Sequence, residues 1–553
     1  MRIAPIKNNF YNNINFTSKV VEVGRGNVSP ELKDAVDKFE ETNGANAKKL
    51  GSGLSAFAYR IKGTDCVLKA SKPGKARVIN GDFSKEAKSL EMIPENFMNA
   101  QRLIGNVRTE DNNWYLLSTF VGGDVPNGKT VKWDRESFKS LMDGLAELDI
   151  NHVYHGDVSK SNCLITKDKQ VNFLDFQYAD KFDFYGDEAH RRNADRYKVP
   201  YFIAPSNLQM FEESNFATYL TEIDEDEARS LFKTYLEEKS NYHEKRANAF
   251  QNQNARYEIV DYDRLMSRYL KNPTEEMITL QAQKLQILLT HRSLLSSIDG
   301  YDNIMSAIPH YLHMIEKSNE MASTASYLAS IETDPDLKRL YEYQKEDAIF
   351  WRAVMKNEVD GRYGKSSAFD WILRNAKMSP NNDWDNIVPT FIKTSEQKHH
   401  IIPDVQNIIV GGSEHFGFEE EKKDDLTSWM EGNLSKLRKT QSFYIHKNSP
   451  SYETIKSHHK SKERILKDLK SAHELYLEGK QYDSLFYSMR SLYRSAVARN
   501  NAYGLVNDRN LSWDEKARMR SEARFFEEYV EDLANMNGHI YGRLYAKASN
   551  PNM

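Results

Sequence analysis

Hydrophobic residues follow two different spacings along this chain. From about residue 45 to residue 125 they form short β-type runs, such as FAYRIKG, DCVLKAS and NWYLLSTFV, separated by Gly, Asn and Asp. These runs predict β-strands joined by turns. The segments DFSKEAKSLEMI and DRESFKSLMDGLAELDI, the latter at residues 134–150, instead predict helices.

Beyond about residue 225, long amphipathic patterns replace the strand signals. Asp334 followed by Pro335 predicts a helix start, and Ser512 with Glu515 forms a candidate capping box for another helix. An apolar stripe in SKERILKDLKSAHELYLEGK predicts a further helix, which Gly479 can end. We therefore expect this part of the chain to be mostly α-helical.

The amino-acid composition and net charge exclude several classes of protein. The chain is 39% hydrophobic and 28% charged, and its formal net charge of −4 gives no basic surplus for binding nucleic acid. Cys66 and Cys163 are too few for a disulfide framework or a thiolate zinc cluster, and neither lies in the helical half, which excludes a thiol nucleophile there. No apolar run predicts a membrane span. We expect a soluble, cytoplasmic protein of a reducing compartment.

The stretch HGDVSKSNCLITKDKQVNFLDFQ, at residues 155–177, carries the candidate chemistry. Asp157 and Asn162 lie five residues apart in a turn-rich segment, and Asp175 ends an apolar strand. Phosphoryl transfer from ATP needs one residue to orient an attacking hydroxyl, and metal ligands to neutralise charge between the phosphates. Two carboxylates and an amide supply these parts.

The spacing of Asp157 and Asn162 matches the catalytic loop H-R-D-x-x-x-x-N, and Asp175 stands where D-F-G begins, so the chain resembles the protein kinase superfamily over about residues 45–215. The other kinase motifs follow in order upstream, in LGSGLSAFAY, CVLKA, KEAKSLEMI and YLLSTFVGG. The resemblance assigns Gly51 and Gly53 to the phosphates, Lys69 to the α and β phosphates, Glu86 or alternatively Glu91 to that lysine, and the backbone of Ser118, Thr119 and Phe120 to adenine, with Leu117 behind it.

The resemblance also implies roles for the residues of the opening stretch. Asp157 would orient the substrate hydroxyl and accept its proton, and Asn162 and Asp175 would hold Mg²⁺. Lys160 would offset charge on the γ-phosphate, from a position shifted relative to the usual one. ATP and Mg²⁺ are therefore the expected cofactors.

Two departures from the kinase pattern qualify these assignments, and a third feature bears on the substrate class. Gly156 replaces the arginine that usually reads a phosphorylated activation loop, so we expect activity that does not depend on loop phosphorylation. Gln177 replaces the glycine of D-F-G, so the segment should switch less freely. Ala204, Pro205 and Ser206 resemble a degraded A-P-E, as in a protein-substrate kinase with a trimmed helical lobe.

The expected fold is α+β, with a bilobal kinase-like domain, consisting of a β-rich amino-terminal lobe and a trimmed helical carboxy-terminal lobe, followed by a mostly α-helical domain. The expected parts are a flexible leader similar to a secretion signal at residues 1–40, the kinase-like domain at 41–225, a helical region at 226–358, a loop-rich joint at 359–422 and a carboxy-terminal helical region at 423–553.

This combination looks most like bacterial secreted (type III-type) effector kinases. It implies phosphorylation of Ser or Thr hydroxyls on a protein substrate, such as a host protein in the host cytosol, with the helical half binding that substrate or a partner. The motif HGD is also similar to that of aminoglycoside-type phosphotransferases. A small-molecule phosphotransferase, a catalytically silent pseudokinase scaffold and transfer of AMP are the alternatives.

A separate motif lies in the loop-rich joint. HHIIP, which contains His399 and His400, resembles the start of a histidine-metal nuclease site, where one His binds a metal and the next activates water. We favour a loop with two polar histidines, because the downstream partners of that motif are not clearly present and the net charge does not suit a nuclease.

Overall fold

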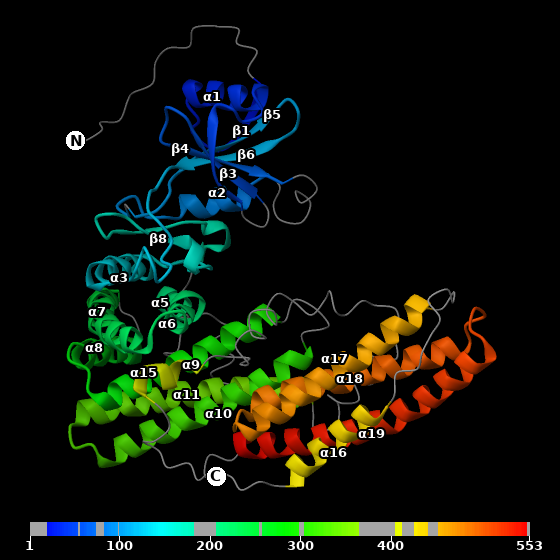
Figure 1. The fold of residues 1–553 in the computed structure, drawn as a ribbon. Coiled ribbons are helices and arrows are strands. Elements are labelled where there is room, and N and C mark those ends of the chain that lie inside the picture. Colours follow the sequence, from blue (N-terminus) through cyan, green and yellow to red (C-terminus); the bar gives the residue numbers. More distant parts are fainter. Residues whose placement is uncertain are drawn as a thin grey trace. The chain divides into compact units, whose positions relative to one another are not determined.

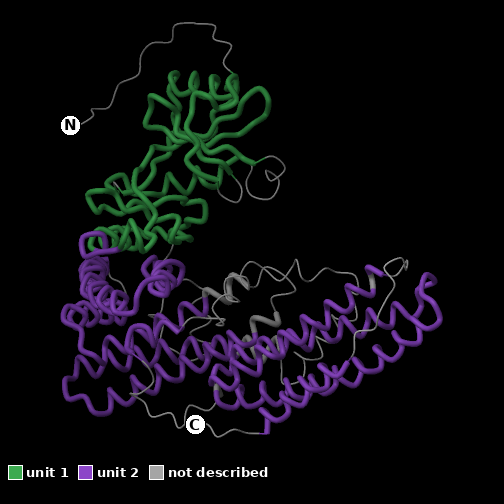
Figure 2. Tube along the Cα trace, in the orientation of Figure 1, with its two compact units in different colours: residues 1–132, 139–183 green, residues 133–138, 184–553 purple. Residues whose placement is uncertain are grey.

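The computed structural model of the protein describes residues 19–52, 56–72, 82–97, 99–181, 206–253, 257–297, 304–363, 404–411, 425–440 and 452–549. The chain divides into two compact units, which Figure 2 colours separately. Unit 1 comprises residues 1–132 and 139–183, and unit 2 comprises residues 133–138 and 184–553. Among the described residues, no helix is long and apolar enough to cross a membrane.

Unit 1 contains a six-stranded antiparallel sheet with the order β1-β5-β6-β4-β3-β2 (Figure 1). The strands are β1 Val20–Gly26, β2 Ala47–Ser52, β3 Ala56–Ile61, β4 Cys66–Ser71, β5 Leu103–Thr109 and β6 Trp114–Thr119. The runs FAYRIKG, DCVLKAS and NWYLLSTFV correspond to β3, β4 and β6, so the prediction of strands there is confirmed. Leu68 and Leu117 pair across β4 and β6 and are fully buried, which places the core on one face of the sheet.

The structure differs from the predicted leader within residues 19–40. Strand β1 pairs with β5, and helix α1 (Pro30–Glu41) packs Val36 and Phe39 into the core of the sheet. Ser29 caps this helix, because its hydroxyl accepts a hydrogen bond from the Leu32 amide at 3.3 Å. This segment has few apolar residues, but the sheet provides the surface against which they pack. Residues 1–18 lie outside the described residues.

The rest of unit 1 holds the loops that carry the candidate chemistry. Its elements are α2 Ser84–Glu91, most of α3 Arg135–Ile150, β7 Val153–Tyr154, η1 Lys160–Asn162, β8 Cys163–Ile165, β9 Val171–Phe173, η2 Phe176–Tyr178 and β10 Asp180–Lys181. Strands β8 and β9 form a hairpin, and β10 pairs with β7. The short ladders therefore fix both ends of the segments around Asp157 and Asp175.

In unit 2 the described residues are mainly helical, as predicted. Its elements are α5 Asn207–Phe211, a π-helical turn η3 Glu212–Phe216, α6 Ala217–Thr221, α7 Glu225–Asn252, α8 Tyr257–Leu270, α9 Glu275–Ser297, α10 Ile304–Ile331, α11 Pro335–Tyr363, α15 Val405–Val410, α16 Asp425–Lys439, α17 Tyr452–Leu477, α18 Gln481–Val506 and α19 Trp513–Ser549. The capping box is confirmed: the Ser512 amide donates to Glu515 Oε2 at 2.8 Å, and the Glu515 amide donates to Ser512 Oγ at 3.2 Å. Gly479 follows α17 with φ of +75°, as expected of a helix terminator.

Two of the predicted boundaries differ from this division. The kinase-like domain was expected to extend to residue 225, but α5, η3 and α6 group with unit 2. In the predicted joint at 359–422, residues 359–363 continue α11 and residues 405–410 form α15. Residues 364–403, which include His399 and His400, and residues 412–422 lie outside the described residues.

Candidate active site

Three elements of unit 1 bring one lysine between two carboxylates. Lys69 lies on β4, Glu86 on α2, and Asp175 two residues after the end of β9. The Lys69 Nζ atom is 2.5 Å from Glu86 Oε1 and 3.0 Å from Asp175 Oδ1. The side chains of Lys69 and Glu86 are 17% and 5% exposed. Lys69, Glu86 and Asp175 therefore form one ion-pair cluster.

The charges of this cluster oppose the cost of burial. Burial lowers the pKa of Lys69, but Glu86 and Asp175 raise it by more, so the net change is upward. Burial raises the pKa of Glu86 and Asp175 adds to that rise, while Lys69 counteracts it. At neutral pH Lys69 is therefore an ammonium, a fixed positive charge of the kind that binds phosphate oxygens.

The backbone at Asp175 turns sharply after β9. Its φ of +61° lies in the left-handed region, which Asp tolerates better than most residues because its short polar side chain can bond locally. The turn η2 follows at once and buries Phe176 completely. Burial of the phenyl ring thus holds the preceding carboxylate at the end of the hairpin.

The loop that contains Asp157 is bonded to itself and to the segment before Asp175. The Asn162 side-chain amide donates to the Asp157 backbone oxygen at 3.0 Å and to its Oδ2 at 2.8 Å. The Leu174 amide donates to the Asn162 backbone oxygen at 2.9 Å. Asp157, Asn162 and Asp175 are consequently held on two cross-linked loops.

His155, to which no role was assigned from the sequence, supports this loop from the interior. The Asp157 amide donates to His155 Nδ1 at 3.3 Å, and the imidazole packs on Phe176 with ring centres 4.2 Å apart. Burial lowers the pKa of His155 to about 4, although Asp175 and the Leu174 backbone oppose that shift. The imidazole is therefore neutral at pH 7. The sequence signal that could have pointed to His155 is its place as the first residue of the motif HGD.

Gly156 has a structural reason to be glycine. Its φ is +79°, and a Cβ atom at this position would meet the Tyr178 backbone oxygen at 2.4 Å and Tyr178 Cβ at 2.7 Å. The loop therefore approaches η2 too closely for any side chain. The arginine of H-R-D has no room here, which gives a physical basis to the expectation that no phosphorylated loop is read.

Helix α2 is anchored on both sides of Glu86. The Ser89 hydroxyl donates to the Ala179 backbone oxygen at 3.0 Å, which ties the helix to the segment after Asp175. Glu91, the alternative partner for the lysine, instead pairs with Arg25 NH1 at 2.7 Å. Of the two candidate glutamates, only Glu86 contacts Lys69 among the described residues.

The segment assigned to adenine lies at the end of β6. The Thr119 amide donates to the Arg102 backbone oxygen at 2.9 Å, and the Phe120 amide donates to the Asp65 backbone oxygen at 2.8 Å. Ser118 is almost fully buried. Two of the backbone donors assigned to adenine are therefore engaged within the protein.

The remaining assigned residues are placed as follows. Gly51 lies in β2 with nothing within 4 Å of a Cβ built on it, Lys160 begins η1, Gln177 lies in η2, and the Ser206 hydroxyl caps α5 in unit 2. Gly53, Ala204 and Pro205 lie outside the described residues.

Asn162 and Asp175 are suited to Mg²⁺ by their chemistry. The amide nitrogen of Asn162 is bound to Asp157, so its oxygen, Oδ1, is the atom available as a metal ligand. Mg²⁺ prefers oxygen ligands and usually takes only one or two protein carboxylates together with phosphates and waters. Within the described residues, no three His, Cys, Asp or Glu side chains gather as a metal site. Asn162 and Asp175 thus offer two oxygen ligands of the kind that Mg²⁺ takes.

Comparison with known proteins shows only limited similarity to this chain. No family model matches the chain. A solved structure of the bifunctional kinase-methyltransferase WbdD is similar to part of it, with 19% sequence identity and a TM-score of 0.21. The similar part covers 27% of this chain and 35% of that protein. The α+β architecture, with an antiparallel sheet followed by helices, is compatible with a kinase-like fold.

Proposed function

We propose that this chain is an ATP- and Mg²⁺-dependent phosphotransferase with a kinase-like active site. The observation that carries the proposal is the Lys69 ammonium, which lies 2.5 Å from Glu86 Oε1 and 3.0 Å from Asp175 Oδ1. Burying an ammonium is unfavourable unless charged partners surround it. A cluster of this kind puts a phosphate-binding cation beside a carboxylate that can hold a metal ion, as phosphoryl transfer requires.

In the proposed reaction, a substrate hydroxyl oxygen attacks the γ-phosphorus of ATP. The bond from that phosphorus to the bridging oxygen breaks, and ADP leaves with the bonding electrons. Asp157 accepts the hydroxyl proton, and the Asn162 amide at 2.8 Å keeps its carboxylate oriented. Lys69 positions the phosphates. Asn162 and Asp175 would hold Mg²⁺, which supplies neutralisation of the phosphate charge.

The acceptor that we propose is a Ser or Thr hydroxyl of a protein, with unit 2 binding that substrate or a partner. Gly156 supports an enzyme that works without loop phosphorylation, because no side chain fits at the position of the phosphate-reading arginine. Such independence suits a secreted effector, which acts in a host cytosol without its own activating kinases. The effector role rests on the resemblance to secreted kinases.

The same glycine favours a second candidate. HGD in place of HRD is also similar to small-molecule phosphotransferases, whose acceptor is the hydroxyl of a metabolite or drug. Both candidates use the same cluster around Lys69 and differ only in the acceptor. A pseudokinase would keep the cluster but transfer nothing.

The test uses the purified chain with Mg²⁺ and ATP labelled on either the α or the γ phosphate. Wild type is compared with Asp175→Asn, and with Asp168→Asn as a control, because Asp168 lies exposed in the turn between β8 and β9. The proposal expects γ label on proteins of a eukaryotic lysate, lost only in Asp175→Asn. Label on aminoglycosides instead of proteins would support the second candidate. Transfer of α label, or no transfer, would reject phosphoryl transfer.

A further inference from the structure

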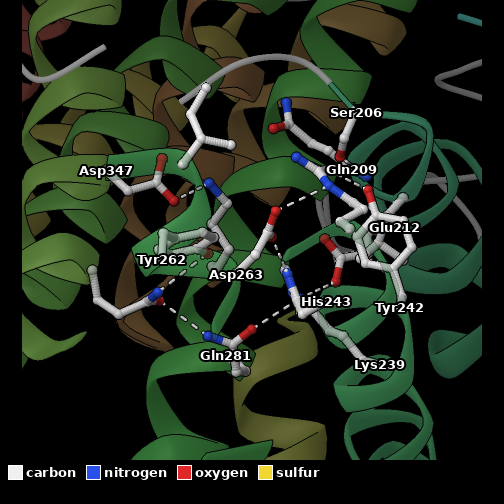
Figure 3. A pocket seen from close by; sticks show the side chains of 15 residues that line it. Ser206, Gln209, Glu212, Lys239, Tyr242, His243, Tyr262, Asp263, Gln281 and Asp347 are labelled. Atoms are coloured by element: carbon white, nitrogen blue, oxygen red, sulfur yellow. Dashed lines mark hydrogen bonds and ion pairs between the residues drawn. The ribbon is translucent and has the colours of Figure 1, made fainter. Parts of the chain in front are cut away.

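Unit 2 contains a cavity that the proposed reaction does not use. Its volume is about 70 Å³, and most of the side chains that line it are polar (Figure 3). They come from α5, η3, α7, α8, α9 and α11, and several of them are almost fully buried. A water molecule occupies roughly 10–15 Å³ on this scale, so the cavity has space for a molecule of a few non-hydrogen atoms.

The charges that line this cavity are balanced. Lys239 Nζ is 2.6 Å from Glu212 Oε1, Arg246 Nε is 3.2 Å from Asp263 Oδ2, and Lys284 pairs with Asp347. Three cations thus face three carboxylates. An occupant with a net charge would remain uncompensated in this buried setting, which is unfavourable. The lining therefore selects for a neutral molecule.

Three acceptor atoms in the lining lack a hydrogen bond. Asp263 Oδ2 has the ion pair with Arg246 instead, whereas His243 and Asp347 each present one open acceptor. His243 Nδ1 lies 2.6 Å from Asp263 Oδ1 and carries the proton, because an ionised carboxylate only accepts. Burial lowers the pKa of His243, so the ring stays neutral and Nε2 is an acceptor. Neither His243 Nε2 nor Asp347 Oδ1 has a partner among the described residues, although both residues are more than nine-tenths buried. Buried acceptors of this kind are costly unless a donor fills them.

The lining also has donors to spare. A lysine ammonium has three N–H groups. Within the described part of the chain, Lys239 Nζ hydrogen-bonds to two acceptors, Glu212 and Gln281, and Lys284 Nζ to one, Asp347. Open donors and open acceptors thus line the same small space. A hydroxyl group can satisfy both, since it donates one hydrogen bond and accepts others.

We propose that this cavity binds a small neutral polyol, whose hydroxyl groups donate to His243 Nε2 and Asp347 Oδ1 and accept from Lys284. Figure 3 shows His243 and Asp347 among the side chains around the cavity. The size limits the ligand to that of glycerol or a tetritol. The site stands independently of the phosphotransferase proposal, because it lies wholly within unit 2.

The test titrates glycerol and erythritol against the full chain, with binding followed by saturation-transfer NMR of the ligand. 1,2-Dimethoxyethane serves as the control ligand, because it matches glycerol in size and has oxygen acceptors but no donor. The proposal expects saturable binding of at least one polyol and none of the diether. Glycine carries an ammonium and a carboxylate, and burying these charges beside side chains that are already ion-paired is unfavourable, so glycine is expected not to compete.

Matched variants then assign the signal to the cavity. His243→Phe and Asp347→Asn each remove one open acceptor and should weaken polyol binding about tenfold or more. Glu342→Gln changes the same charge on the same helix, α11, outside the lining, and should bind as wild type does. Circular dichroism checks folding, and a crystal structure with glycerol gives a readout that needs no variant. Absence of saturable polyol binding, equal binding of the diether, displacement by glycine, or a structure with water alone at both acceptors would overturn the proposal.

Discussion

Gly156 allows a direct test of how the loop around Asp157 is held. A Cβ atom at residue 156 would meet the Tyr178 backbone oxygen at 2.4 Å, and φ is +79°. The left-handed backbone costs a residue with a side chain about 1–2 kcal/mol. Forcing an extra carbon into a packed site costs about 1–3 kcal/mol more. We therefore expect Gly156→Ala to destabilise unit 1 by about 2–5 kcal/mol.

Gly63 provides the matched control, because it lies in the same unit with φ of +78° and nothing within 4 Å of a Cβ built on it. Gly63→Ala should cost only the backbone term, about 1–2 kcal/mol. Hydrogen exchange of the unit 1 amides measures both losses, since a chain of two units need not unfold in one step. Gly156→Ala should also slow phosphoryl transfer about tenfold or more by displacing Asp157. Equal destabilisation by the two variants would refute the reasoning.

Three other predictions concern single side chains. Glu86→Gln should lower kcat about 10–100-fold in an ADP-release assay, because it removes the carboxylate nearest to Lys69, whereas Glu91→Gln should leave kcat unchanged. As the pH falls from 6.5 towards 4, the unfolded chain should bind a proton at His155 before the folded chain does, because the folded pKa is about 4. Unit 1 should then lose up to about 3 kcal/mol of stability, measured by hydrogen exchange, and His155→Gln should flatten this dependence. Ser512→Ala should destabilise the first turn of α19 by about 1 kcal/mol, seen as faster exchange of its amides and absent from α18.

The strands of the sheet and the motif residues could be predicted from the sequence because local sequence patterns indicate both. Lys69 lies within the run CVLKA, which predicts a strand. The spacing of Asp157 and Asn162 is set within a single loop. The choice between Glu86 and Glu91 needed the structure, because it depends on which turn of α2 lies nearest to β4. Arg25, which pairs with Glu91, is far from it in the sequence.

Features that depend on distant partners could not be predicted in the same way. Strand β1 has a mostly exposed burial pattern, and its pairing with β5 joins segments about 80 residues apart. The reason for Gly156 lies in its close approach to Tyr178, which the motif does not encode. The cavity of unit 2 is built from polar positions on several helices, and each position alone resembles a solvated helix face.

The central proposal is that the cluster around Lys69, together with Asp157, transfers the γ-phosphoryl group of ATP. The most direct measurement follows the γ label and ATP binding together in wild type, Asp157→Asn and Asp175→Asn. The account predicts that Asp157→Asn still binds ATP with Mg²⁺ but transfers no label, and that Asp175→Asn also transfers none. Undiminished transfer of the γ label by Asp157→Asn or Asp175→Asn would contradict it.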